Sequence, residues 1–384
     1  MFPARNFGRF FNKALKQPVY ALKVGWKRLV AGLSYKFGDG RASYPESVTI
    51  FLTHRCNLRC KMCGQWGEGG VTRQERPELI REEMNQVELN ALIDGMSDFK
   101  PNITLFGGEP FLHTRCLEVI ERIKMRGMHC LVITNGFMVE ELADKLVAIG
   151  LDELNVSLDG ARDLHDQIRG CPGLFDKIMG GLKKIHSIKA SRNLSKPLVN
   201  LQCTITKYNY KRLPEMLAVA RDAGADSLTF HNLIFLDEGI LAKQASYDIA
   251  LGSSSAEWRG FLFSPGIDVD ELWRIIKKIK MEKQEINVDF YPNFNYMELV
   301  EYYKHPDRSP AGQASRCMSP WVTAYIFPDG EMRPCLNSTY SYGNVKDKLF
   351  KGVWNSSMAV KFRSELKKAG AFPVCARCTE LYRY

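Results

Sequence analysis

Three cysteine side chains lie within one short run of the sequence, at Cys56, Cys60 and Cys63. The CxxxCxxC spacing places three thiolates on one tight loop, and thiolates are the usual protein ligands of iron–sulfur clusters. Three sulfurs can bind three irons of a [4Fe–4S] cube and leave the fourth iron without a protein ligand. Electron-transfer clusters normally have four cysteine ligands, so an open iron indicates a cluster that binds a further molecule.

The same three cysteines allow two different interpretations. A closed zinc site needs four ligands, and His54 stands two residues before the loop, where it could be the fourth. A disulfide is the second possibility. The 384-residue chain has eleven cysteines and no convincing secretory signal. That usage is typical of metal ligands and spare thiols in a reducing cytoplasm rather than of a disulfide framework.

A second group of four cysteines lies near the C-terminus, at Cys317, Cys335, Cys375 and Cys378. Residues 323–327 and 331–334 flank an Asp-Gly turn, which predicts a β-hairpin that brings the first two of these cysteines together. The last two form a CxxC motif. Four thiolates suit a closed site that holds either zinc or a fully ligated iron–sulfur cluster, and the spacing does not separate these two interpretations.

The first cysteine loop directly follows residues 47–52, a β-branched and apolar run that predicts a buried parallel strand. Five more strand-like segments lie at 103–106, 130–134, 154–158, 198–206 and 227–234. Helical segments alternate with them at 86–99, 115–127, 139–149, 174–189 and 212–223. This alternation predicts an α/β fold with a partial (β/α)6 TIM-like barrel. The functional residues of such barrels lie at the carboxyl ends of the strands, where the cysteine loop also falls.

Four regions are expected along the chain. They are a basic amphipathic extension (1–46), the barrel (47–235), a connector (236–310) and a small C-terminal domain of hairpin and helix that holds the second cysteine group (311–384). Within the connector, the apolar spacing after Asp268 predicts a helix with that residue as its N-cap, and 286–290 is a further strand-like run.

The net charge of +10 is concentrated at the N-terminus, because residues 1–38 contain eight Lys or Arg and no acid. Aromatic residues are interspersed among these basic ones. Such a segment is typical of helices that pack on the barrel, of helices at a membrane interface or, least favoured by this pattern, of nucleic-acid contacts. No apolar run reaches 18 residues, so no transmembrane helix is expected. We expect a cytoplasmic protein with no nucleic-acid partner, and membrane-surface contact through 1–38 stays open.

The run at 56–63 resembles the radical S-adenosylmethionine (SAM) superfamily, whose pattern is CxxxCxΦC. Met62 occupies the Φ position, where the family has an aromatic residue. The Gly-Gly-Glu-Pro run at 107–110 is similar to the family's GGE motif, and the Ser-Leu-Asp-Gly run at 157–160 is similar to its ribose-binding strand. These motifs stand in the family's order and cover most of 47–235.

This resemblance implies SAM and a [4Fe–4S] cluster as cofactors, with Cys56, Cys60 and Cys63 as cluster ligands and catalytic residues. It implies SAM contacts from Met62, Gly107, Gly108, Glu109, Asn135, Ser157, Asp159 and Arg169. Among these, Glu109 is expected at the methionyl ammonium and Arg169 at the methionyl carboxylate. An enzyme of this kind cleaves SAM reductively to a 5′-deoxyadenosyl radical, which abstracts hydrogen from an organic substrate.

The C-terminal run Cys317-x12-Gly330-x4-Cys335 is similar to the opening of the SPASM auxiliary-cluster domain. A full SPASM domain binds two clusters, and the four cysteines here resemble its shortened "twitch" form with one auxiliary [4Fe–4S] cluster. The resemblance implies an oxygen-sensitive radical SAM oxidoreductase that uses an electron donor such as flavodoxin or ferredoxin. Its substrate is a small molecule or, alternatively, a peptide, as in the radical SAM maturases of ribosomal peptides. The sequence also leaves open a non-catalytic zinc-binding protein and a simple redox carrier.

Overall fold

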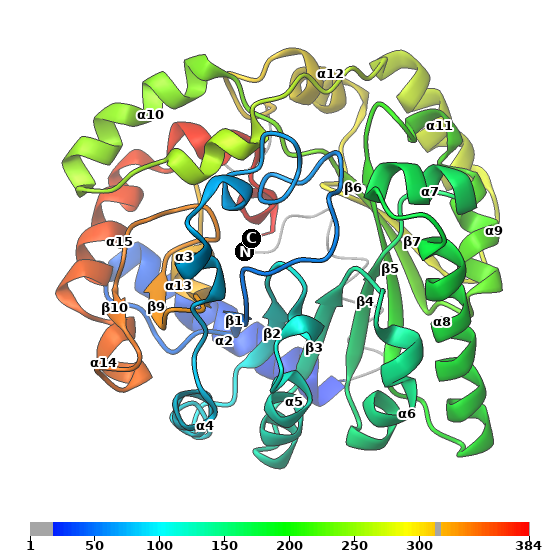
Figure 1. Cartoon of the computed structure of the whole chain (residues 1–384). Helices are drawn as coiled ribbons and strands as arrows, with labels where there is room; N and C mark the ends of the chain where they lie inside the picture. Colours follow the sequence, from blue (N-terminus) through cyan, green and yellow to red (C-terminus); the bar gives the residue numbers. More distant parts are fainter. Residues whose placement is uncertain (1–17, 312–315, 384) are drawn as a thin grey trace.

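The structure is a computed structural model that describes residues 18–311 and 316–383 (Figure 1). Seven parallel strands form the larger part of a single sheet of ten described strands, and they follow one another in the order in which they occur in the chain. They are β1 (Ser47–Phe51), β2 (Asn102–Phe106), β3 (Cys130–Thr134), β4 (Glu153–Ser157), β5 (Leu198–Ile205), β6 (Ser227–Asn232) and β7 (Asn287–Tyr291). The sheet curves around a central space (Figure 1), so the predicted partial barrel is confirmed, and β7 extends it by one strand.

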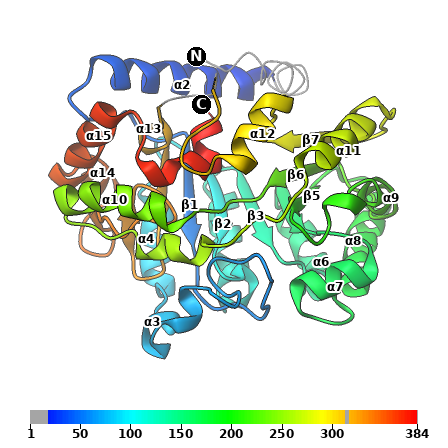
Figure 2. The same ribbon diagram turned by 90° about the horizontal axis from the view of Figure 1, so that it is seen from above.

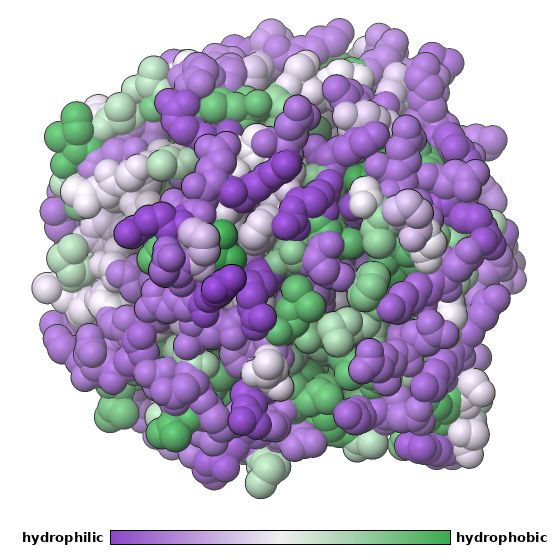
Figure 3. Space-filling model, viewed as in Figure 1, coloured by the Kyte–Doolittle hydropathy of each residue, from purple (hydrophilic) through white to green (hydrophobic). Residues whose placement is uncertain are grey.

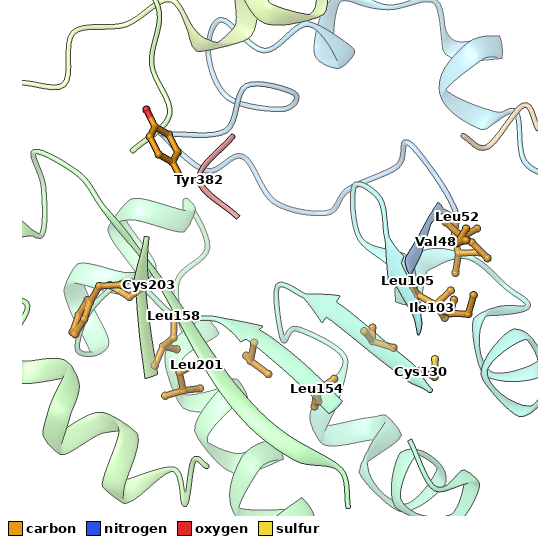
Figure 4. Close-up of a cluster of buried hydrophobic side chains, with 14 of the residues drawn as sticks. Val48, Leu52, Ile103, Leu105, Cys130, Leu154, Leu158, Leu201, Cys203 and Tyr382 are labelled. Carbon is orange, nitrogen blue, oxygen red and sulfur yellow. The ribbon is translucent and has the colours of Figure 1, made fainter. Parts of the chain in front are cut away.

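Helices cover the outer face of this sheet. They are α4 (Gln86–Asp94), α5 (Cys116–Met125), α6 (Val139–Ile149), α7 (Arg162–Arg169), α8 (Leu174–Ser191) and α9 (Glu215–Asp222). Every second side chain of a strand faces these helices, as Val48, Ile103 and Leu154 do, and all three are fully buried. Figure 4 shows this apolar layer following the sheet from strand to strand. Alternate strand residues are half-buried instead and face the barrel interior.

The connector contains three helices besides β7, namely α10 (Glu238–Leu251), α11 (Val269–Met281) and α12 (Tyr296–Lys304). The predicted N-cap of α11 is confirmed, because the Asp268 side chain accepts hydrogen bonds from two backbone N–H groups of the first turn. The sequence pattern did not predict α10, in which apolar and polar residues alternate without a clear helical stripe.

The C-terminal hairpin is also confirmed, with antiparallel strands β8 (Thr323–Ile326) and β9 (Glu331–Arg333). The hairpin is continuous with the barrel, because β8 pairs in parallel with β1. Strand β10 (Gly343–Asn344) and helices α13 (Ser319–Val322), α14 (Phe350–Trp354) and α15 (Ser357–Ala369) complete this region. One sheet thus runs through the expected domains, whose boundaries stay predictions.

Helix α2 (Pro18–Phe37) lies across the end of the barrel at which the strands begin (Figure 2). Two polar contacts help to hold it there. Arg28 forms an ion pair with Glu46, which precedes β1, at 2.7 Å, and Lys27 donates a hydrogen bond to the backbone oxygen of Phe99, which precedes β2. The expectation for residues 1–17 lies outside the described residues. Among the described helices, none combines the length and the apolar character needed to cross a bilayer.

Candidate functional site

The first cysteine loop begins where β1 ends and folds back on the last turn of α7. Within the loop the backbone N–H of Cys63 donates to the oxygen of Cys60 at 3.1 Å, and the N–H of Lys61 donates to the oxygen of Ile168 in α7. The loop therefore lies at the carboxyl end of the sheet, as predicted for the functional end of a barrel.

A hydrogen-bond donor lies near each of the three sulfurs. The backbone N–H of Trp66 is 3.3 Å from the Sγ of Cys63, a guanidinium nitrogen of Arg169 is 3.7 Å from that of Cys60, and the Asn135 amide is 4.0 Å from that of Cys56. Donors directed at sulfur stabilise thiolates and tune the potential of a cluster that they bind.

Burial raises the pKa of the Cys56 thiol to about 12, because a thiolate without a counter-charge is costly in a desolvated loop. A bound cationic iron centre would remove that cost. The three-thiolate loop with its directed donors thus fits an iron–sulfur cluster by its donor chemistry. Among the described residues, no three His, Cys, Asp or Glu side chains converge closely enough to hold a single metal ion.

His54, considered above as a fourth ligand, packs against aromatic rings. Its ring centroid lies 5.5 Å from that of Phe51 and 6.3 Å from that of Phe327, and burial lowers the pKa of its imidazole to about 4. Its Nδ1 atom is buried and makes no hydrogen bond within the described residues. All eleven cysteines of the chain are free of disulfides.

Gly107 and Gly108 follow β2 and press against the chain that leads into the cysteine loop. The backbone N–H of Gly108 donates to the oxygen of Thr53 at 2.8 Å, and that of Glu109 donates to the oxygen of Arg55 at 2.8 Å. A Cβ atom on Gly107 would lie 2.6 Å from the Thr53 oxygen, and one on Gly108 would lie 2.2 Å from the Arg55 oxygen. Only glycine fits this close crossing, which sets the position of the cysteine loop.

Glu109 is almost completely buried, with 1% of its surface exposed. Its carboxylate accepts hydrogen bonds from the Thr134 hydroxyl and the Asn135 backbone N–H, both at 2.7 Å, and a longer one from Phe111. Burial outweighs these bonds and raises the pKa of Glu109 to about 7. The carboxylate therefore ties the loop after β2 to the loop after β3.

Asp159 and Arg169 form an ion pair at 2.6 Å. Asp159 is fully buried, and its second oxygen accepts from the backbone N–H of Thr204 at 2.8 Å. Burial alone would lower the pKa of Arg169, but Asp159 and Cys60 together raise it above its ordinary value. The family resemblance implied a separate contact with SAM for each of these two residues. The structure pairs them with each other and places Arg169 between Asp159 and the cluster loop.

Asn135 also links two parts of the site, because its amide donates to the Asn57 side chain inside the cysteine loop at 2.8 Å. Ser157 is half-buried at the end of β4, and Met62 is partly buried against the hydrophobic core. The structure thus gathers the predicted residues at the carboxyl ends of β1 to β4. Their roles toward SAM stay predictions. Sequence reasoning missed Asn57 and Thr134, although both are direct neighbours of residues that it selected.

The second cysteine group converges on a small cavity of about 50 Å³, which all four thiols line. Cys317 precedes α13, Cys335 follows β9, and Cys375 and Cys378 belong to one 3-10 turn, in which the N–H of Cys378 donates to the oxygen of Cys375. Burial raises the pKa of Cys335 to about 12 and that of Cys375 to about 11. Four thiols from three segments, one of them buried and three half-buried, fit a fully ligated cluster.

A larger cavity of about 640 Å³ occupies the barrel interior and reaches the second cysteine group. Its wall includes Cys335 and Cys378. The inner face of the sheet contributes mostly polar side chains, among them Thr49, Thr104, Asn155, Gln202, His231 and Tyr291. This volume lies within the usual range of small-molecule sites.

The comparisons with known proteins agree with this geometry. Models of the Radical SAM superfamily and of an iron–sulfur cluster-binding domain (SPASM) match residues 50–195 and 317–379. Fe-coproporphyrin III synthase of Methanosarcina barkeri is 27% identical over 85% of this chain and 79% of that protein. Pre-heme d1 synthase of Dinoroseobacter shibae is 29% identical over 81% and 73%. The solved structure of Streptococcus suis SuiB bound to its precursor peptide SuiA shares the fold, with a TM-score of 0.61 and 13% identity over 92% and 77% of the two chains.

Proposed function

We propose that this chain, which belongs to the radical SAM superfamily and carries a C-terminal SPASM iron–sulfur domain, oxidises a small organic substrate. Its cofactors are SAM, a [4Fe–4S] cluster and an auxiliary iron–sulfur centre in the C-terminal domain. When bound, these groups supply hydrogen-atom abstraction from an unactivated C–H bond and an acceptor for the second electron. Eleven free cysteines suit a protein that works in the reducing cytoplasm.

The described residues have distinct tasks in this proposal. Cys56, Cys60 and Cys63 hold the first cluster. The ion pair with Asp159 fixes the guanidinium of Arg169 beside the Sγ of Cys60. Glu109 is the buried carboxylate that would accept a hydrogen bond from the SAM ammonium. Its existing donors, Thr134 and Asn135, hold it in one orientation for that contact.

One observation supports a net oxidation above all. The interior cavity of about 640 Å³ has two of the four auxiliary cysteines, Cys335 and Cys378, in its wall. A substrate in this cavity would therefore lie against the auxiliary site, where it can lose an electron after it has lost a hydrogen atom. Loss of a proton from the substrate would complete a two-electron oxidation. An external one-electron donor, a flavodoxin or a ferredoxin, would return the first cluster to its reduced state.

The test uses protein purified and reconstituted without oxygen. Two clusters predict about eight irons per chain, whereas two zinc sites predict about two zinc ions. With SAM and dithionite the protein should form 5′-deoxyadenosine, Cys60→Ala should abolish it, and Cys375→Ala should retain it while losing about half of the iron. A redox carrier would form no 5′-deoxyadenosine, and zinc in place of iron would exclude the whole mechanism.

The substrate class is tested by the same assay, since the substrate should accelerate 5′-deoxyadenosine formation. We expect acceleration by a molecule small enough for the interior cavity. SuiB, which shares this fold, binds the precursor peptide SuiA, so peptide pools form the comparison arm. Acceleration by peptides alone would contradict the small-molecule proposal and leave the radical chemistry intact.

A further inference from the structure

Helix α2 has two apolar faces, and one of them points away from the protein. Val24 and Ala31 are buried against the barrel. On the other side, large apolar side chains stand exposed at helical spacing, namely Trp26 (67% exposed), Leu29 (55%), Leu33 (49%) and Phe37 (74%). A helix on a globular protein normally directs its single apolar stripe at the core. We call these four residues the outer stripe of α2.

The outer stripe belongs to a helix that is firmly attached. The inner face of α2 holds the Arg28–Glu46 ion pair and the Lys27 hydrogen bond described above, and the Tyr35 ring meets Trp321 edge-on, with ring centroids 4.9 Å apart. Figure 2 shows α2 along one border of the molecule, with the other helices all on its inner side. The exposure is therefore a property of a docked helix.

Other exposed apolar residues in the described chain are more dispersed. Examples are Ile249 on α10 and Met281 at the end of α11, at 83% and 85% exposure. Figure 3 shows hydrophilic residues over most of the face opposite α2, with hydrophobic ones scattered among them. Single exposed apolar residues need no explanation, whereas a contiguous stripe marks an interaction surface.

The charge around α2 indicates which kind of surface would bind the outer stripe. Residues 1–38 contain eight Lys or Arg and no acid. At the C-terminal end of α2, Lys36 is exposed, Arg316 lies over the Tyr35 ring at 5.4 Å, and Lys367 donates to the backbone oxygens of Lys36 and Gly38. The nearby acid Asp39 lies 3.9 Å from Arg41. An apolar stripe bordered by cations complements an anionic lipid surface.

We propose that α2 docks the protein on the surface of an anionic membrane. The outer stripe enters the boundary between headgroups and acyl chains, with Trp26 at the interface that suits its amphipathic ring. The basic residues at the C-terminal end of α2, Lys36, Arg316 and Lys367, contact lipid phosphates. Because α2 and the cysteine loop lie at opposite ends of the sheet, docking leaves the cysteine loop directed away from the bilayer. It also holds the α2 end of the interior cavity, lined by Val24 and Arg28, next to the lipid.

The test is flotation of the full-length protein with vesicles under anaerobic conditions. One set of vesicles contains phosphatidylcholine alone, and the other contains phosphatidylcholine and phosphatidylglycerol in equal parts. We expect the protein to float with the anionic vesicles and to bind the neutral ones at least about tenfold more weakly. Binding should weaken as salt is added, since the attraction of basic residues to lipid is screened.

The decisive variant is the double substitution Leu29→Ser and Leu33→Ser, which removes the centre of the outer stripe. Both side chains are half-exposed, so the fold should tolerate the change, and an unchanged circular dichroism spectrum and iron content would verify this. Partitioning into anionic vesicles should fall by at least about tenfold, because two apolar side chains no longer leave water. The matched control is Ile249→Ser with Met281→Ser, which removes two apolar groups that are even more exposed but lie elsewhere on the protein, and it should bind like the parent.

Three results would overturn the proposal. The first is absence of binding to anionic vesicles by the full-length protein. The second is equal loss of binding in the control and in the α2 variant. The third is a protein that dimerises without lipid and becomes monomeric when Leu29 and Leu33 are replaced, as measured by light scattering, because a second copy would then cover the outer stripe. None of these results depends on the enzymatic reaction, so they leave the proposed function untouched.

Discussion

Replacing Gly108 by alanine tests how the cysteine loop is positioned. The added Cβ would lie 2.2 Å from the backbone oxygen of Arg55, and real Cβ contacts are almost never shorter than 3.0 Å, so the two segments must separate by about 0.8 Å. The obstacle is backbone, which cannot rotate away as a side chain could. The substitution therefore displaces the segment that leads directly into Cys56.

The expected cost follows from the contacts at this crossing. Overpacking of a tight site costs about 1–3 kcal/mol. The shift also weakens the backbone hydrogen bonds of Gly108 to Thr53 and of Glu109 to Arg55, each worth about 1 kcal/mol. We expect Gly108→Ala to lower the free energy of unfolding by about 3 kcal/mol. The first cluster should be lost preferentially, since its loop loses its anchor.

The assay is urea denaturation of the anaerobic protein, together with iron analysis. The matched control is Gly69→Ala, since a Cβ at Gly69 meets nothing within 4 Å. The control should keep its iron and its stability, with a change of less than about 1 kcal/mol. If Gly108→Ala retains all of its iron and unfolds at the same urea concentration as the parent, the close crossing does not position the loop and the reasoning is wrong.

Three further predictions concern buried charge near the same loop. The substitution Arg169→Lys removes the hydrogen bond to Asp159 and brings a shorter side chain less close to Cys60. SAM should therefore bind about tenfold more weakly, while the iron content stays unchanged. Isothermal titration calorimetry measures the SAM affinity, and an affinity equal to that of the parent would refute the prediction. Burial lowers the pKa of His165 to about 3 from 6.5, so the stability that its neutral ring contributes is complete above pH 6.5 and is lost as the pH falls. The variant His165→Asn should therefore lose less stability than the parent below pH 6.5 in urea titrations. The stability contributed by Glu109 depends on pH in the opposite direction, because burial raises its pKa from 4.5 to about 7: the contribution is complete below pH 4.5 and is lost as the pH rises to 7. Glu109→Gln should therefore flatten the dependence of the unfolding free energy on pH between 4.5 and 7. If that dependence has the same slope in the variant as in the parent, Glu109 is not its source.

The local sequence pattern was sufficient to predict strands β1 to β9 and to single out both groups of cysteines, whereas the two-residue strand β10 was not predicted. Residues 130–134 and 139–149 were predicted with their observed bounds, since a short β-branched run and a helical apolar stripe are signals within one segment. Helix 212–223 was predicted too long at its start, and the observed helix begins at Glu215, after Pro214. The proline fits the first turn of a helix but cannot donate the hydrogen bond of an interior residue.

Short segments of the sequence already indicate which residues can bind metal and where along the strands they stand, because thiolate chemistry and apolar periodicity are local properties. The contacts between residues far apart in the sequence are set by the fold. In the fold, Asp159 pairs with Arg169, and Glu109 accepts a hydrogen bond from the backbone N–H of Asn135. The C-terminal hairpin joins β1, and one face of α2 points outward. These relations depend on which distant segments meet when the sheet curves, and no local periodicity encodes that meeting.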